Sequence, residues 1–215
     1  TGQYITSTNE FFAHIPRKQI IGITGTRGKS PVAALVAHIL KTAGKDVAFL
    51  GNIGEPMLAD LLEEHTSDRV YVLELSSYML DDIEYSPHIA AVLNLAPDHM
   101  PYHGSAENYF TAKKNIINFQ YASDYFAYNQ DDELLVQWAE KAVGQVMKTT
   151  EDVLVTPQET KLIGEHNMYN IRMATTIARL YGLDDTEIKQ GIRGFEPLPF
   201  RLELVGTYKD IIFID

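Results

Sequence analysis

Short apolar runs alternate along the chain with longer stretches in which apolar residues recur at helical spacing. Four runs, rich in Val, Ile and Leu, are typical of buried parallel strands; they lie at 19–23, 46–50, 70–75 and 89–93. The longer stretches predict helices at 31–43, 57–64 and 107–119. We therefore predict an α/β fold of three layers, in which helices cover both faces of a mostly parallel central sheet.

The pattern changes in the second half of the chain. A strand is expected at 125–128 and a helix at 131–142, whereas 146–163 is typical of short antiparallel or irregular structure. The remaining expected elements are two helices, at 167–181 and 184–192, and a hairpin formed by 202–207 and 208–214. The predicted fold therefore includes a small antiparallel β element.

Composition limits the class of protein. The chain has 215 residues, of which 45% are hydrophobic, so it is long enough for one large domain with a buried core. The net charge of −11 argues against a protein that coats nucleic acid or an anionic membrane. Because the chain has no cysteine, it has no thiolate ligands, and any bound metal should be a hard cation.

The sequence has neither a secretory signal pattern nor an apolar run approaching the roughly 18–20 residues that cross a membrane. We therefore expect a cytoplasmic monomer with no membrane insertion and no nucleic-acid partner. The first residue is not Met and the last residues form an apolar, strand-like run. We expect the chain to be a piece of a longer enzyme.

The stretch TGTRGKS predicts a phosphate-binding loop between a strand and a helix, with Pro31 at the first helical position. Its glycines would let backbone N–H groups approach an anion, and Lys29 would add positive charge for the outer phosphates. The hydroxyl of Ser30 could bind magnesium. Ile23 replaces a consensus glycine, so this is a variant loop, and a turn with a chance Gly-Lys-Ser is the alternative. We expect ATP or a close relative to bind Thr24, Gly25, Thr26, Arg27, Gly28, Lys29 and Ser30.

Polar residues follow two later strands of the predicted sheet. Glu74 would lie beside the phosphate loop, where a carboxylate can bind magnesium; a cap of the next short helix is the alternative. Asp98, His99 and His103 suggest a second ligand set, with a structural hydrogen bond as the alternative for His103. Lys113 lies next to Lys114 on a predicted helix, where two lysines most often form a solvated face.

Six motifs together resemble the Mur ligase family. They are TGTRGKS at 24–30, GNIG at 51–54, LELSSY at 73–78, PDH at 97–99 with HG at 103–104, YFTAK at 109–113 and GEHNMYN at 164–170. Their order and spacing cover nearly the whole chain. The GNIG and ELSS elements favour the branch of the family that adds D-glutamate.

The resemblance implies an ATP-dependent amide ligase of peptidoglycan precursor synthesis. In the family, ATP phosphorylates a carboxylate of a UDP-linked muramoyl substrate, and the amine of an amino acid, here D-glutamate, attacks the acyl phosphate. Family members have three domains. The resemblance places this whole chain, residues 1–215, in the central ATP-binding domain, so that the N-terminal UDP-binding and C-terminal amino-acid-binding domains are absent from it.

The resemblance also implies roles for individual residues. Lys29, Lys113 and His99 would be catalytic, and Lys113 matches a lysine that the family carbamylates. Two departures from the family pattern are Pro31, where Thr is common, and Phe200, where His usually precedes Arg201. The implied magnesium ligands are Ser30, Glu74, His99 and Lys113 as its carbamate, the substrate contacts are Asn52, Ser76 and His103, and further nucleotide contacts are Asn167, Asn170 and Arg201.

Two other functions remain open at this point. A phosphate-loop kinase or NTPase of another lineage would need neither Lys113 nor the pair of Asn167 and Asn170. A nucleotide-binding module without turnover is the other, either because the chain is an isolated fragment or because the longer protein is regulatory; Lys29, Glu74, His99 and Lys113 argue against the regulatory form.

Overall fold

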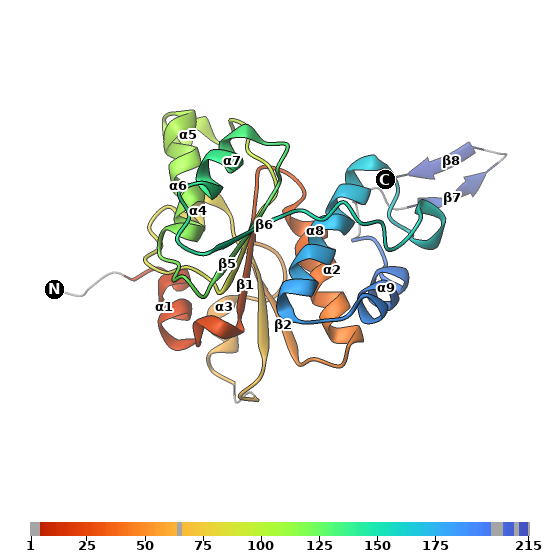
Figure 1. The fold of residues 1–215 in the computed structure, drawn as a ribbon, viewed down its shortest axis with the longest axis horizontal. Helices are drawn as coiled ribbons and strands as arrows, with labels where there is room; N and C mark the ends of the chain where they lie inside the picture. Colours follow the sequence, from red (N-terminus) through yellow and green to blue (C-terminus); the bar gives the residue numbers. More distant parts are fainter. Residues whose placement is uncertain (1–4, 64–65, 199–203, 209–210, 215) are drawn as a thin grey trace.

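A six-stranded parallel sheet forms the centre of the computed structural model, which describes residues 5–63, 66–198, 204–208 and 211–214 (Figure 1). The strand order is β2-β3-β1-β4-β5-β6. The strands are β1 (Ile20–Thr24), β2 (Val47–Gly51), β3 (Val70–Glu74), β4 (Ile89–Val92), β5 (Tyr125–Tyr128) and β6 (Gln145–Lys148). Because β1 pairs in parallel with both β3 and β4, the residues that follow these three strands share one edge of the sheet.

Helices cover both faces of the sheet, as expected. One face carries α2 (Lys29–Thr42), α8 (Glu165–Tyr181) and α9 (Asp185–Gly194). The other carries α1 (Ser7–His14), α3 (Met57–Asp60), α4 (Ser77–Leu80), α6 (Ala106–Asn118) and α7 (Glu133–Ala139). The remaining elements are α5 (Met100–His103) and the short 3₁₀ helices η1 (Arg17–Gln19) and η2 (Pro157–Glu159). No helix in the described part of the chain is long and apolar enough to span a membrane.

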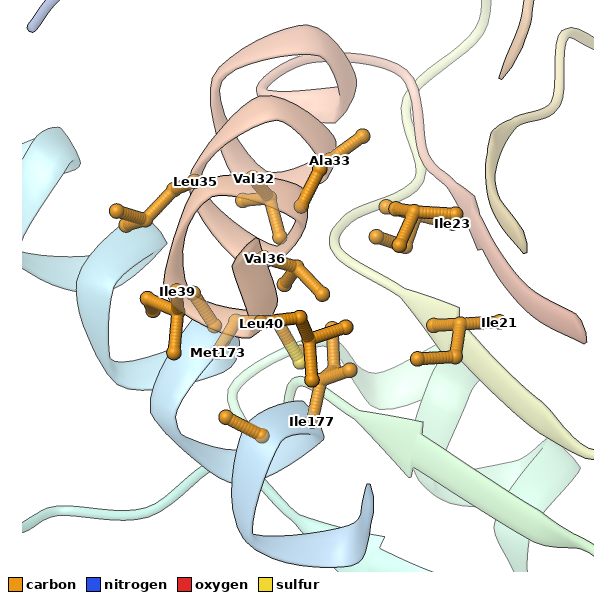
Figure 2. Packing of buried hydrophobic residues seen from close by; sticks show 14 of the residues in the cluster. Ile21, Ile23, Val32, Ala33, Leu35, Val36, Ile39, Leu40, Met173 and Ile177 are labelled. Atoms are coloured by element: carbon orange, nitrogen blue, oxygen red, sulfur yellow. The ribbon is translucent and has the colours of Figure 1, made fainter. Parts of the chain in front are cut away.

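The core lies in two layers, one on each side of the sheet. Successive side chains of a strand point to opposite faces, so Ile20 packs in one layer and Ile21 in the other. Figure 2 shows the second layer, in which side chains of α2 meet Ile21 and Ile23 of β1, together with Met173 and Ile177 of α8. The phosphate-loop helix therefore packs on the sheet and against α8 beside it, which fixes the direction of its N-terminus.

The edge strand β6 differs from the prediction. The segment expected to be short antiparallel or irregular structure begins with β6, which pairs in parallel with β5. The reason is α7, because a strand that follows a helical crossover returns in the same direction. The antiparallel pairing lies outside the six-stranded sheet, between β7 (Leu204–Tyr208) and β8 (Ile211–Ile214).

Several helix ends also differ from the prediction. Helix α2 begins at Lys29, so Pro31 is its third residue rather than its first; proline is accepted there because the first four N–H groups of a helix have no intrahelical acceptor. Helix α3 ends at Asp60 instead of residue 64, which lies outside the described residues. Helix α9 covers 185–194 rather than 184–192, and Asp184 is its N-cap, one of the two Asp residues that the sequence predicts for this role; its carboxylate accepts from two backbone N–H groups.

Candidate active site

The loop between β1 and α2 is held by the segment that follows β4. The Oδ1 atom of Asn94 accepts a hydrogen bond from the backbone N–H of Arg27 (2.9 Å), and its Nδ2 donates to the Arg27 carbonyl (3.0 Å). Gly28 has φ 82°, and a Cβ there would lie 2.9 Å from Oδ1 of Asn170. The loop therefore needs glycine for its backbone conformation and for the close approach of α8.

Lys29 and Ser30 are the first two residues of α2. The ammonium group of Lys29 folds over its own loop, where Nζ donates to the carbonyls of Gly25 (3.0 Å) and Thr26 (3.1 Å). Ser30 is buried at the same helix N-terminus. A helix N-terminus and an ammonium group on one loop provide the donors and the positive charge that phosphate oxygens require.

Lys113 belongs to this site and not to a solvated helix face. It lies on α6, its side chain is 1% exposed, and its Nζ donates hydrogen bonds to Oγ1 of Thr24 (3.2 Å) and to the carbonyl of Gly25 (2.9 Å). The structure thus places this amine directly behind the phosphate loop.

The surroundings of Lys113 disfavour its charged form. Burial, and after it the positive charge of Lys29, lower the pKa of Lys113 to about 7. The carboxylates of Asp98 and Glu74 act in the opposite direction but do not compensate. An amine with this pKa is neutral in a large fraction of molecules at neutral pH, and the neutral form is the nucleophilic one.

Glu74 ends β3 as a buried carboxylate with one unused oxygen. Its side chain is 1% exposed, Oε1 accepts from Nδ2 of Asn52 (2.9 Å), and Oε2 has no hydrogen-bond partner among the described residues. Burying such an oxygen is costly unless a donor or a cation compensates it. The donor set therefore fits a hard cation beside the loop.

The alternative role for Glu74, as a helix cap, does not hold. Helix α4 is capped by Ser76, whose Oγ accepts from the backbone N–H of Met79 (3.3 Å). The hydroxyl of Ser76 is therefore engaged in local structure, and the carboxylate of Glu74 points to Asn52 instead.

The two histidines predicted as part of one ligand set have different surroundings. His99 has φ 54°, its side chain is 45% exposed, and its Nε2 lies 3.7 Å from Oδ2 of Asp98. His103 is buried and its Nε2 lies 3.0 Å from Oγ of Ser77, which is the structural hydrogen bond left open as the alternative. Within the described ranges, no group of three or more His, Cys, Asp or Glu residues is arranged to hold a metal ion.

Tyr109 connects these parts and was not singled out from the sequence. Its hydroxyl lies 3.1 Å from Oγ1 of Thr26, its ring centroid is 5.0 Å from Nζ of Lys113, and ring contacts link it to His99 and His103. Asn94 was also missed. The available signals were the motif that contains Tyr109 and the position of Asn94 just after a buried strand.

Asn167 and Asn170 form a buried pair at the start of α8. Nδ2 of Asn170 donates to Oδ1 of Asn167 (2.9 Å), and Nδ2 of Asn167 donates to the carbonyl of Ile163 (2.8 Å). A Cβ at Gly28 would collide with Oδ1 of Asn170, so this pair lies close to the phosphate loop. Arg201 and Phe200 lie outside the described residues.

Comparison with known proteins supports the same family. Residues 23–153 match the protein family described as the Mur ligase middle domain. The UDP-N-acetylmuramoylalanine–D-glutamate ligase of Salinibacter ruber is 34% identical over 91% of this chain and 50% of its own length. The ligase of the same name from Christiangramia forsetii is 33% identical over 100% of this chain and 54% of its own length. The chain thus spans about half the length of the curated relatives it matches.

Solved structures show the same fold at lower identity. MurF from Acinetobacter baumannii superposes with a TM-score of 0.74 at 21% identity, covering 97% of this chain and 52% of that chain. MurF ligase from Thermotoga maritima in complex with ADP has a TM-score of 0.73 at 18% identity, and the match covers 97% of this chain and 55% of that chain. The family match over residues 23–153, together with the site described above, leads to one conclusion: this chain belongs to the Mur ligase middle-domain family.

Proposed function

We propose that the chain is the central ATP-binding domain of a ligase that adds D-glutamate to UDP-N-acetylmuramoyl-L-alanine. UDP-binding and amino-acid-binding domains outside this chain would complete it. The substrate assignment rests on relatives that carry this name and are 33–34% identical over most of the chain. The observation that carries the proposal is the buried Lys113, which a phosphate-loop kinase or NTPase of another lineage does not need.

The phosphate loop supports the nucleotide part of the proposal. The backbone N–H groups at the start of α2 and the ammonium of Lys29 would bind the phosphates. During transfer of the terminal phosphoryl group to the substrate carboxylate, Lys29 would neutralise charge that develops on the phosphoryl oxygens. The position of Asn170 close to Gly28 supports a nucleotide that extends from the loop toward the start of α8.

The metal part rests on Glu74, Ser30, His99 and a carbamylated Lys113. The unpartnered Oε2 of Glu74 is suited to a hard cation, and carbamylation would turn the Lys113 amine into a second carboxylate-like ligand. When bound, magnesium would supply positive charge that stabilises phosphoryl transfer. On the substrate side the implied contacts are Asn52, Ser76 and His103. Each already has a partner in this structure, which is Glu74 for Asn52, the backbone N–H of Met79 for Ser76 and Ser77 for His103.

The full-length protein tests this function directly. With ATP and magnesium, phosphate release is expected to require both UDP-N-acetylmuramoyl-L-alanine and D-glutamate, and mass spectrometry should detect their amide. Release of phosphate without the amine would indicate an NTPase, and binding of ATP without any release would indicate a module without turnover.

The Glu74→Gln variant tests the metal site. It keeps the shape of the side chain and removes the charge, so we expect ATP affinity to fall by about tenfold with magnesium and to change little without it. Isothermal titration calorimetry with and without EDTA measures both. The exposed Glu140→Gln serves as the control for loss of one negative charge. Equal losses with and without magnesium would contradict a metal role for Glu74.

A further inference from the structure

The hydroxyl group of Thr24 is the side-chain partner of the Lys113 amine. Thr24 ends β1 and is fully buried, and its Oγ1 donates to the carbonyl of Leu75 at 2.7 Å. A hydroxyl has one hydrogen, so the Thr24 oxygen presents only lone pairs to Lys113, whose Nζ lies 3.2 Å away. Although Thr24 belongs to the phosphate loop, its side chain therefore binds Lys113.

The second partner of the amine is also an acceptor. Nζ of Lys113 donates to the carbonyl of Gly25 at 2.9 Å, and these two bonds are all that it makes with the described residues. A neutral amine has two N–H groups and one lone pair. When both N–H groups are held by Thr24 and Gly25, the lone pair is left pointing along the one remaining tetrahedral direction.

We propose that Thr24 is a positioning residue for carbamylation of Lys113, because it orients the amine lone pair for attack on carbon dioxide. This inference rests on the proposed role of Lys113. In the reaction, the Nζ lone pair forms a bond to the carbon, one C=O π pair moves to oxygen, and one Nζ proton leaves to water. The product is a carbamate anion whose nitrogen keeps one hydrogen.

The same hydroxyl suits the product as well as the amine. After carbamylation Nζ has one N–H group, so one of its two acceptors loses a donor. The carbonyl of Gly25 can only accept, whereas the hydroxyl of Thr24 can rotate from the Leu75 carbonyl and donate to a carbamate oxygen. Thr24 is thus the partner that can adapt to both forms of Lys113.

The Thr24 hydroxyl also has a structural role, so the test must separate loss of stability from loss of carbamylation. Its bond to Leu75 links the end of β1 to the residue after β3, so loss of the hydroxyl would lower stability in any case. Thr149 provides a matched control, because it is also buried, directly follows β6, and its hydroxyl donates to a carbonyl of the neighbouring strand, that of Tyr128 (3.0 Å).

The test measures the carbamate itself in the full-length protein. Wild type, Thr24→Ser, Thr24→Val and Thr149→Val are titrated with ¹³C-bicarbonate at fixed pH, and the carbamate carbon is quantified by NMR. We expect Thr24→Val to weaken carbamylation by about tenfold, the cost of one hydrogen bond, and Thr24→Ser and Thr149→Val to stay within about twofold of wild type. Cyanate, which adds to neutral amines, provides a second readout as mass-spectrometric labelling of Lys113.

The outcomes separate this inference from the proposed function. A wild-type carbamate signal that Thr24→Val leaves unchanged overturns the role of Thr24 and keeps that of Lys113. A wild type without any signal, in a protein that still ligates, overturns both carbamylation of Lys113 and this inference but not the ligase function. If Thr24→Val does not fold, Thr24→Ala removes the same hydroxyl and carries the same expectation.

Discussion

The Lys113→Met variant is expected to be more stable than wild type at pH 6, by on the order of 2 to 4 kcal/mol. At this pH the amine of Lys113 is charged in both the folded and the unfolded state, and in the folded state it is buried and only partly compensated. The lowering of its pKa from 10.5 to about 7 expresses this cost. Methionine has a similar length and carries no charge.

This advantage should shrink as the pH rises. Between the folded pKa of about 7 and the unfolded value of 10.5, the unfolded wild type binds more protons at Lys113 than the folded one. Wild-type stability therefore increases with pH over this interval, whereas methionine contributes no such slope. Urea denaturation in carbonate-free buffer between pH 6 and 10 measures the difference. Lys114→Met, one position further along α6, is the control, and a difference for Lys113→Met that does not vary with pH would contradict the lowered pKa.

The substitution that raises stability should lower ligase activity. If the proposed function holds, Lys113→Met or Lys113→Ala in the full-length protein is expected to reduce amide formation by at least about 100-fold, because the carbamate that would complete the proposed metal site cannot form. Phosphate release in the presence of D-glutamate measures it. A variant that gains stability and loses activity indicates a residue kept for chemistry. Unchanged product formation would rule out the carbamate.

The sequence predicted the layers of the fold because short apolar runs rich in Val, Ile and Leu mark β1 to β4, and stretches of helical period lie between them. It gave no bounds for the short helix after Glu74, which is α4, and did not predict α5, since a four-residue helix is too short to show a helical period. It also assigned the wrong pairing to the segment that contains β6. That strand is exposed at every position, so it lacks the apolar run that marks a buried parallel strand.

The residues of the site were predictable from motifs, but most of their contacts were not. The sequence did contain one signal for Lys113. The buried residues of α6 are Tyr109, Ala112, Lys113, Ile116 and Ile117, which recur at the spacing of one helix face. Lys113 lies on that face and Lys114 does not. What no pattern could reveal was the acceptor for each proton. The pairing of β1 with β3 brings Leu75 to Thr24, and the packing of α6 against β1 brings Lys113 to Thr24 and Gly25.

The Gly51→Ala variant is expected to lose at least about 3 kcal/mol of folding free energy. Gly51 ends β2 with φ 114°, and a Cβ there would lie 2.3 Å from the carbonyl oxygen of Glu74. That oxygen is backbone on the neighbouring strand, and it accepts a hydrogen bond from the backbone N–H of Asn52 (2.9 Å). The methyl group must therefore push β2 and β3 apart at the point where Glu74 and Asn52 are positioned.

A matched glycine separates collision from backbone strain. Gly182 has φ 106°, close to that of Gly51, but a Cβ there meets nothing within 4 Å. Gly182→Ala should therefore cost only the strain of the left-handed conformation, about 1 kcal/mol. Urea denaturation of both variants measures the difference. If the two substitutions lower the folding free energy equally, the backbone at the end of β2 shifts without displacing Glu74. If Gly51→Ala lowers it more and also weakens magnesium-dependent ATP binding, the close approach of β2 to β3 holds Glu74 in place.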